Sequence, residues 1–212
     1  MSIAGNAGAL MADENRYSPE TRQRLYADIY ADSLWLTELV ENLLASTRLE
    51  EDPANLQLSG ELVEELFAEA LAHVHADSGH AIQSETPSDL LMVRSDAKLI
   101  VQVLVNLIGN ALKYTPPGST IRLSARRRGT EAILSVADDG PGVPAEDRER
   151  VFDMFFVGDN PASAGRKSLG LGLALCRTIV NAHGGRIWVE DNSPHGAVFS
   201  FTLPVEEVAE HG

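Results

Sequence analysis

Residues 95–114 read SDAKLIVQVLVNLIGNALKY, the pattern of an amphipathic helix that begins at Ser95-Asp96. Its apolar residues recur at helical spacing on one face: Ile100, Leu104, Leu107 and Ala111. Asn106, Asn110 and Lys113 cluster on a neighbouring side of this helix. Amide oxygens can bind Mg²⁺, and an ammonium group can bind phosphate. Taken alone, these three residues also fit a polar face in contact with solvent.

A second motif, Asp138-Asp139-Gly140-Pro141-Gly142, follows a predicted strand at 132–137 that pairs with another at 121–125. Glycines allow a ligand to approach the backbone, and a carboxylate can accept a hydrogen bond from an exocyclic amine. A tight turn rich in Asp, Gly and Pro is the alternative interpretation of this motif.

A third motif, Gly170-Leu171-Gly172-Leu173, opens a predicted helix at 170–182. Free N–H groups at a helix N-terminus form a ready anion site. The preceding stretch, residues 157–167, ends in two cations, Arg166 and Lys167. A connection of this length between helices indicates a lid.

Residues 18–50 predict one long helix, with Ser18 as N-cap and Pro19 in the first turn. An apolar stripe with a break at Asp32 runs along it: Leu25, Ile29, Leu36, Leu39 and Leu43. This stripe requires another chain, sequence outside this one, or packing on the following domain. Glu51-Asp52-Pro53 ends the helix, which divides the chain into domains 1–52 and 53–212.

The remaining pattern predicts an α+β fold, a mixed sheet covered by helices in a two-layer sandwich. The other expected elements are helices near 60–76 and 145–151, and strands near 81–84, 90–93, 186–190 and 198–203.

The composition excludes several classes of protein. With 44% hydrophobic and 23% charged residues, the 212-residue chain is typical of a globular protein. A net charge of −14 disfavours nucleic acid and anionic membrane surfaces as partners. The single cysteine, Cys176, fits a reducing compartment, and no signal peptide or spanning segment is visible, so we expect a cytoplasmic location.

The order of the motifs is more specific than any one of them. Asn-x-x-x-Asn-Ala-x-Lys-Tyr (106–114), Asp-x-Gly-x-Gly (138–142), a Phe-rich segment (152–156) and Gly-Leu-Gly-Leu (170–173) follow one another. This series closely resembles the N, G1, F and G2 boxes of sensor histidine kinases. The resemblance covers about residues 55–204. Together with the preceding helix, it covers almost the entire chain.

The resemblance implies the Bergerat (GHKL) ATP-binding fold, with ATP and Mg²⁺ as ligands. Asn106 and Asn110 would serve Mg²⁺ and phosphate, with Lys113 beside the phosphates and Tyr114 near the nucleotide. Asp138 would accept the adenine amino group. Other residues would shape the pocket or hold phosphates under the lid: Gly140, Gly142, Arg166, Lys167, Gly170, Leu171 and Gly172.

The resemblance also implies partners. The helix 18–50 would be the second helix of a dimerisation and phosphotransfer domain, so a homodimer and a response regulator receiver domain are expected. The start of the chain and Gly196-Ala197-Val198-Phe199 are most similar to the potassium-responsive KdpD sensors, which would place the full-length protein in a bacterial membrane.

The phosphoacceptor motif of the family, His-(Glu/Asp)-Leu-Arg-Thr-Pro, is absent from this sequence. The chain begins Met1-Ser2-Ile3-Ala4-Gly5, as though cut just after that motif, and none of its six histidines has the following residues. We therefore expect a fragment that holds the nucleotide site without its own acceptor.

Three positions depart from the family pattern: Gly109 replaces a frequent acidic residue, Val157 an Arg, and Ser168 a glycine. They leave open a degenerate nucleotide-binding module without kinase activity. ATPases such as gyrase share the fold but use a carboxylate base where Asn106 stands. Because an amide cannot accept a proton, we expect slow hydrolysis and transfer to a histidine.

Overall fold

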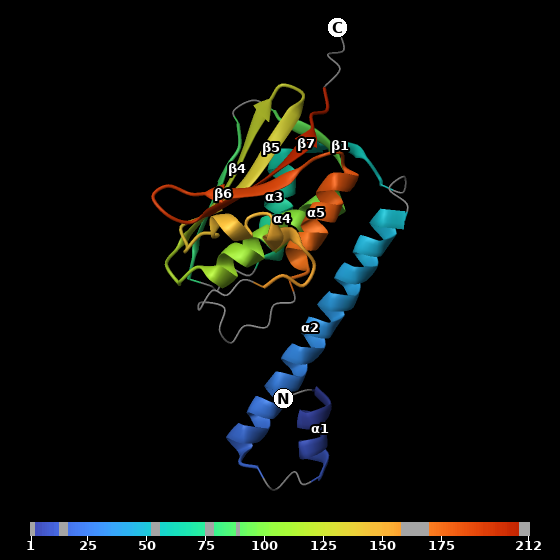
Figure 1. Cartoon of the computed structure of the whole chain (residues 1–212), viewed down its shortest axis with the longest axis vertical. Helices are drawn as coiled ribbons and strands as arrows, with labels where there is room; N and C mark the ends of the chain where they lie inside the picture. Colours follow the sequence, from blue (N-terminus) through green and yellow to red (C-terminus); the bar gives the residue numbers. More distant parts are fainter. Residues whose placement is uncertain are drawn as a thin grey trace. The chain divides into compact units, whose positions relative to one another are not determined.

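A computed structural model describes residues 3–12, 17–51, 56–74, 79–87, 90–157 and 170–207. The chain divides into two compact units, residues 1–45 and 46–212, and each is described by itself. Helix α1 (Ile3–Ala12) and most of helix α2 (Pro19–Glu51) belong to the first unit (Figure 1). None of the helices in the described ranges is both long enough and apolar enough to cross a membrane.

Helix α2 confirms the predicted long helix. The Ser18 Oγ accepts a hydrogen bond from the Thr21 N–H at 3.3 Å, so Ser18 caps the first turn. Of the predicted stripe, Leu25 is buried, Ile29 is partly buried and Leu36 is 42% exposed. The side chains of Leu39 and Leu43 lie outside the described part of the structure.

The second unit is built on a five-stranded sheet with the order β2-β4-β5-β7-β6. β2 runs parallel to β4, and all other neighbours are antiparallel. The strands are β2 (Ala81–Glu85), β4 (Thr120–Arg128), β5 (Glu131–Asp138), β6 (Ile187–Asp191) and β7 (Ala197–Pro204). Since Ala137 pairs with Val198, the end of β5 and the start of β7 lie at the same edge of the sheet.

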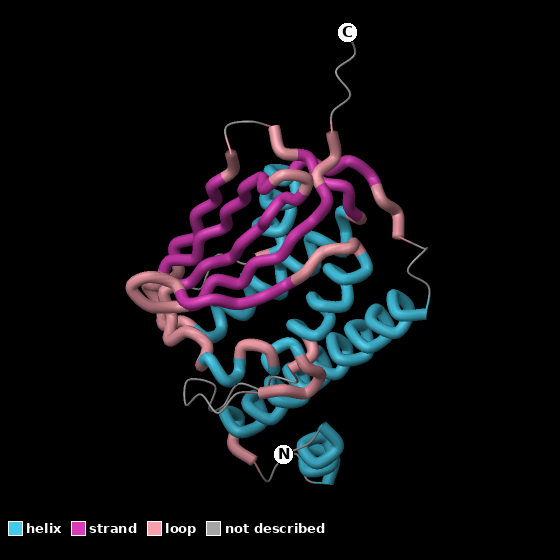
Figure 2. Tube along the Cα trace, turned by 45° about the horizontal axis from the view of Figure 1, so that its top comes forward, coloured by secondary structure: helices cyan, strands magenta, loops and turns pink. Residues whose placement is uncertain are grey.

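Helices α3 (Val63–His73), α4 (Ala97–Tyr114) and α5 (Gly172–Ala182) form a layer on one face of this sheet (Figure 2). The predicted apolar face of α4 is buried as expected, at Ile100, Leu104, Leu107 and Ala111. It packs with β5, whose inward-facing residues Ala132, Leu134 and Val136 are also buried. The predicted two-layer α+β sandwich is therefore confirmed.

Two predicted helices are shorter than expected. The helix predicted near 60–76 begins only at Val63, because β1 (Ser59–Leu62) pairs with β3 (Met92–Ser95) in a separate two-stranded sheet. The helix predicted near 145–151 is instead two 3₁₀ turns, η3 (Ala145–Asp147) and η4 (Arg150–Phe152). Tertiary pairing overrides local helix propensity in the first case, and short connecting segments commonly adopt 3₁₀ geometry, as in the second.

The C-terminal end of α5 is bonded to the N-terminal end of α4. The Asp96 side chain caps α4 by accepting a hydrogen bond from the Leu99 N–H at 3.4 Å. The backbone N–H of Asp96 donates to His183 Nε2 at 3.0 Å, and His183 Nδ1 donates to the Ile179 carbonyl at 2.7 Å. Burial lowers the pKa of His183, so its ring is neutral at pH 7. His183 is thus a structural residue.

Candidate functional site

A cavity of about 150 Å³ lies among α4, the loop after β5 and the start of α5. Six of the residues predicted for the site line it: Asn110, Tyr114, Asp138, Gly142, Gly170 and Gly172. Ala197 and Phe199 of β7 line it as well. The structure therefore brings all four predicted motifs to one cavity, with Phe156 contributed by the Phe-rich segment.

Asp138 is the last residue of β5 and only 7% exposed. Its Oδ1 atom accepts hydrogen bonds from the backbone N–H groups of Gly140, at 2.9 Å, and Ala197, at 3.3 Å. Within the described ranges, no hydrogen bond reaches its Oδ2 atom. Because the side chain lines the cavity, one carboxylate oxygen is left for a donor placed there.

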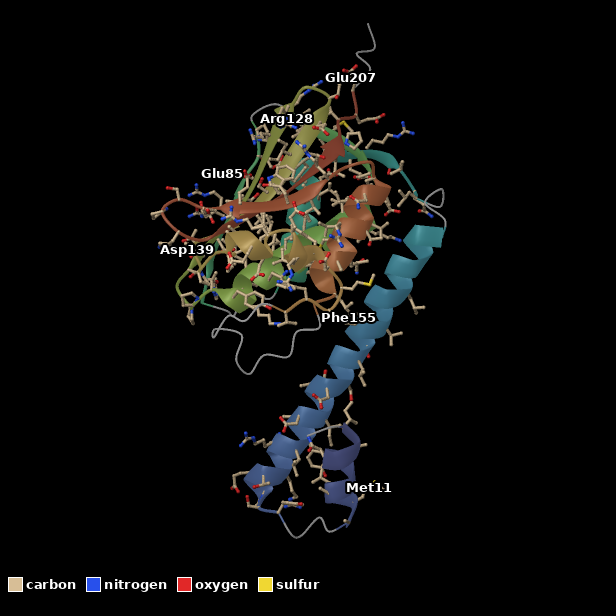
Figure 3. The ribbon with its side chains drawn as sticks, viewed as in Figure 1. Met11, Glu85, Arg128, Asp139, Phe155 and Glu207 are labelled. Carbon is tan, nitrogen blue, oxygen red and sulfur yellow. The ribbon has the colours of Figure 1, made fainter. Side chains whose placement is uncertain are left out.

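The adjacent carboxylate of Asp139 has a different role. Its Oδ2 atom accepts a hydrogen bond from the Thr120 N–H at 3.0 Å, which lowers the pKa of Asp139 and ties β5 to the start of β4. Figure 3 shows Asp139 at this edge of the sheet.

Burial raises the pKa of Asp138, although the Gly140 and Ala197 N–H groups oppose that shift. Of the two carboxylates, Asp138 is therefore the one whose charged form is disfavoured by burial, and it lines the cavity.

The two glycines of the second motif allow close packing around this carboxylate. A Cβ atom on Gly140 would lie 2.7 Å from Thr115 Cγ2, and one on Gly142 would lie 3.0 Å from the Gly196 carbonyl oxygen. The loop after β5 thus passes tightly between the end of α4 and the turn before β7. Gly140 does not line the cavity; it supports Asp138 from behind.

The polar cluster of α4 lies on the side of that helix next to α5. Asn110 and Tyr114 line the cavity, whereas Asn106 lies one turn earlier, and its Nδ2 atom donates to the Gly172 carbonyl at 3.5 Å. Lys113 Nζ lies 5.3 Å from the centre of the Tyr114 ring. Asn106 and Lys113 are partly buried, and neither lines the cavity.

Helix α5 begins at the cavity with no side-chain cap. Its N-cap residue, Leu171, buries its side chain, so only its backbone is available to a ligand. Gly172 and Leu173 line the cavity in the first turn. Uncapped N–H groups of an 11-residue helix make this end a suitable place for an anion.

The ends of the predicted lid meet beside α5. The Phe155 N–H donates to the Gly170 carbonyl at 3.2 Å, and a Cβ atom on Gly170 would collide with the Phe156 carbonyl oxygen. The Arg150 guanidinium lies 4.6 Å from the Phe156 ring centre, and Phe155 itself is 64% exposed (Figure 3). Arg166, Lys167 and Ser168 lie outside the described residues.

Sequence reasoning missed the contribution of the β6–β7 turn. Asn192 donates a hydrogen bond from Nδ2 to the Asp138 carbonyl at 2.8 Å, and Ala197 bonds the Asp138 carboxylate. Phe199 lines the cavity and packs edge-to-face on Phe152, with 6.2 Å between ring centres. Only the pairing of β5 with β7 brings these residues to the site, and a local motif does not encode that pairing.

The side chains present fit a magnesium ion that is held mainly by the phosphates of a bound nucleotide and by water. In the parts of the chain that the structure describes, no group of three or more His, Cys, Asp or Glu residues could hold a metal. Asn106 and Asn110 offer amide oxygens one helical turn apart. Mg²⁺ is commonly bound in this way, through few protein oxygens together with phosphates and waters.

Comparison with known proteins identifies the class. Residues 95–207 match the family model of histidine kinase-, DNA gyrase B- and HSP90-like ATPases, and the chain belongs to this family. The catalytic domain of histidine kinase ThkA is 30% identical, with a TM-score of 0.61, over 70% of this chain and 97% of that domain. The chain thus contains a catalytic ATP-binding domain of the protein histidine kinase type.

Longer relatives extend the similarity to the N-terminal helices. The sensor protein KdpD of Clostridium acetobutylicum is 36% identical over 205 residues, which are 96% of this chain and 23% of KdpD. Full-length ShkA in complex with AMPPNP is 29% identical, with a TM-score of 0.74, over 98% of this chain and 44% of ShkA. ThkA in complex with the response regulator TrrA is 27% identical, with a TM-score of 0.72, over 96% of this chain and 57% of that chain.

We predict that Gly170→Ala lowers the free energy of unfolding by about 2 kcal/mol or more. Gly170 has a φ of +63°, and the added methyl group would collide with the Phe156 carbonyl oxygen. Gly109→Ala is the matched control, because Gly109 is exposed in α4 with open space at its Cβ position. It should raise the free energy of unfolding by about 0.5–1 kcal/mol. Urea unfolding measures both; equal stabilities for the two variants would contradict this account of the contact.

Proposed function

We propose that the cavity binds ATP with the adenine amino group donating to Oδ2 of Asp138. The observation that carries this proposal is the asymmetry of the carboxylate: Oδ1 is occupied by two backbone N–H groups, and Oδ2 is not. An exocyclic amine is a donor that suits a buried carboxylate with one free oxygen. Ala111, Val143 and Phe199 line the cavity and supply apolar surface for a base.

The phosphates would extend from there to the start of α5. The uncapped N–H groups of Gly172 and Leu173 would bind them, with Gly170 and Leu171 contributing backbone only. Lys113, Arg166 and Lys167 would add positive charge, as the resemblance to the kinases implies. The net charge of −14 makes such local cations necessary, because the rest of the surface repels phosphate.

Mg²⁺ would be held by the amide oxygens of Asn106 and Asn110 together with the phosphate oxygens. When bound, the ion would neutralise charge that develops on the transferring phosphoryl group. Asn106 is also bonded to Gly172, so it would align the metal ligands with the phosphate site on α5.

The reaction we propose is transfer of the γ-phosphoryl group to a histidine of the dimerisation domain, and then to an aspartate of a response regulator. The imidazole nitrogen would form a bond to phosphorus while the bond to the ADP oxygen breaks, and ADP would leave. The chain's own residues would position the reacting groups and neutralise the phosphate charge. This is most of what a loose transition state requires. The complex of ThkA with TrrA supports the response regulator as partner.

Helix α2 would pair with another chain. Its exposed apolar residues Tyr26 and Val40 are two heptads apart, as are Tyr30 and Leu44. Ser33 and Thr37 stand between them on the same side, and their hydroxyl groups donate to carbonyls of the helix itself. The Ser33 and Thr37 hydroxyl groups are therefore already hydrogen-bonded within the helix.

By the same resemblance, we propose that this region works in the bacterial cytoplasm, as part of a membrane-bound sensor. The buried free thiol of Cys176 is compatible with a reducing compartment. The chain spans 23% of KdpD, so the stimulus would act through segments of such a protein that have no counterpart here.

We predict that Asp138→Asn lowers ATP affinity by about 10- to 100-fold or more, because the amine loses a charged acceptor. The fold should be retained or stabilised, since an amide oxygen still accepts the two N–H groups and no buried charge remains. The pKa of Asp138 is raised by burial, so its charge lowers stability above that pKa. Hence the stabilisation by Asn should be largest near neutral pH and vanish in acid.

Asp139→Asn is the matched control for this variant, because Asp139 bonds the Thr120 N–H rather than facing the cavity. It should retain ATP affinity close to that of the unmodified chain. Isothermal titration with ATP and Mg²⁺ measures both affinities. Tight ATP binding by Asp138→Asn would remove Asp138 from the proposed site.

We predict that the chain binds Mg-ATP, takes up no phosphate on itself, and phosphorylates an added histidine-bearing helical hairpin domain weakly. The reason is that an untethered acceptor loses effective molarity. His183 is buried at the opposite end of α5 from the phosphate site and is bonded on both ring nitrogens. Incubation with γ-labelled ATP and an acid-lability test measure the outcome; strong acid-labile label on the chain alone would contradict it.

We predict that the chain self-associates through α2, because burying the exposed half of a Val or Leu side chain contributes about 1 kcal/mol, and the exposed Tyr rings add apolar area. Sedimentation should show a monomer–dimer equilibrium that shifts with concentration. Val40→Glu with Leu44→Glu should shift it to monomer. A monomer at every concentration for the unmodified chain would show that the helix packs elsewhere.

A further inference from the structure

The turn between β6 and β7 and the first residue of β7 each hold Asp138 at one point. Asn192 Nδ2 donates to the Asp138 carbonyl at 2.8 Å, and the Ala197 N–H donates to the Asp138 carboxylate at 3.3 Å. Figure 1 shows this turn at the edge of the sheet where β5 ends. Asp138 is therefore fixed at its main chain by this turn and at its side chain by the first residue of β7.

The turn is itself rigidly organised around Asn192. The Asn192 N–H donates to the Gly196 carbonyl at 3.0 Å, and its Oδ1 atom accepts from the Ser193 N–H at 2.9 Å. A Cβ atom on Gly196 would collide with the Asp138 carbonyl oxygen, so the turn lies directly against the strand end. All three hydrogen-bonding atoms of Asn192 named here are thus committed to the turn or to Asp138.

A second tie joins this turn to the wall of the cavity. Arg148 Nη2 lies 2.5 Å from Asp191 Oδ1, and Arg148 Nε donates to the Val143 carbonyl at 3.4 Å. Val143 lines the cavity, and Asp191 directly precedes Asn192. The exposed ion pair contributes little energy by itself, but it links the turn to the loop after β5.

We propose that Asn192 is a positioning residue for Asp138 and sets the preference of the site for purines that carry a 6-amino group. This inference rests on the proposed function, in which Oδ2 of Asp138 accepts from that amine. Asn192 does not line the cavity, so it would act only through Asp138. A hydrogen bond weakens steeply as its angle and distance depart from ideal values. A shifted carboxylate would therefore form a weaker hydrogen bond with the amine.

The chemistry predicts a specific loss rather than a general one. ATP presents a 6-amino donor to Oδ2, whereas ITP presents a carbonyl oxygen, so that two acceptors face each other. ITP binding therefore gains nothing from a well-placed carboxylate. Displacing Asp138 weakens ATP binding, leaves ITP binding nearly unchanged, and reduces the ratio of the two affinities.

The test compares ATP and ITP affinities of the unmodified chain with those of Asn192→Asp and Asn192→Ala. Asn192→Asp keeps an oxygen to accept from the Ser193 N–H but removes the donor to the Asp138 carbonyl. Both variants should lose about tenfold in ATP affinity and in the ATP/ITP ratio. Asn181→Ala, at an exposed site near the end of α5, is the matched control and should change neither.

The outcomes separate the two proposals. If the unmodified chain binds neither nucleotide, or binds both equally, the proposed adenine contact fails and this inference fails with it. If the unmodified chain prefers ATP and both Asn192 variants keep that preference, the positioning role alone is overturned. Equal weakening of ATP and ITP also overturns it, because that pattern indicates general loosening of the site. Thermal melting confirms folding of each variant, and Asn192→Asp decides the question if Asn192→Ala does not fold.

Discussion

A carboxylate buried at the end of a strand needs hydrogen-bond donors from its surroundings, and Asp138 draws on three segments at once. Gly140 in the following loop and Ala197 in β7 donate to its carboxylate, and Asn192 in the turn before β7 donates to its main-chain carbonyl. These bonds require β7 to lie next to β5, with glycines where the segments touch. The cavity exists because the loop and the turn are drawn around this one side chain, which leaves a single oxygen turned to the interior.

The second constraint is the antiparallel packing of α4 and α5, which is fixed by polar contacts along its whole length. Asp96 bonds His183 at one end, Cys176 Sγ lies 3.8 Å from the Val103 carbonyl in the middle, and Asn106 bonds Gly172 at the other end. The register shifts by no more than one residue from one pair to the next. Consequently the uncapped start of α5 cannot lie anywhere except beside the amides of α4, and the phosphate and metal ligands of the proposed site come together through helix packing.

How far the sequence predicts this arrangement depends on the range of the interactions. Caps and periodicity are local, so the long helix at 18–50, the helix ending at Tyr114 and the main strands were predicted within a few residues. The motifs of the site were found because Asn, Asp and Gly stand at local spacings. The strand β1 was missed because only its pairing with β3 makes Ser59–Leu62 extended. Asn192 was missed for the same reason, since its partner lies 54 residues away in the sequence.

The chemistry of the cavity wall favours one kind of acceptor for a phosphoryl group. Among the described residues, the carboxylates that line it are Asp138 and Asp147. Asp138 is used as a hydrogen-bond acceptor, and Asp147 lies 3.4 Å from the Arg150 guanidinium. Asn106, where a hydrolase of this family would need a base, is an amide and accepts no proton. Water or a hydroxyl group must lose a proton to become a strong nucleophile, whereas a neutral imidazole nitrogen already presents a lone pair. A site that positions phosphates but offers no base would therefore be matched to histidine, and bound ATP would be hydrolysed slowly in the proposed site.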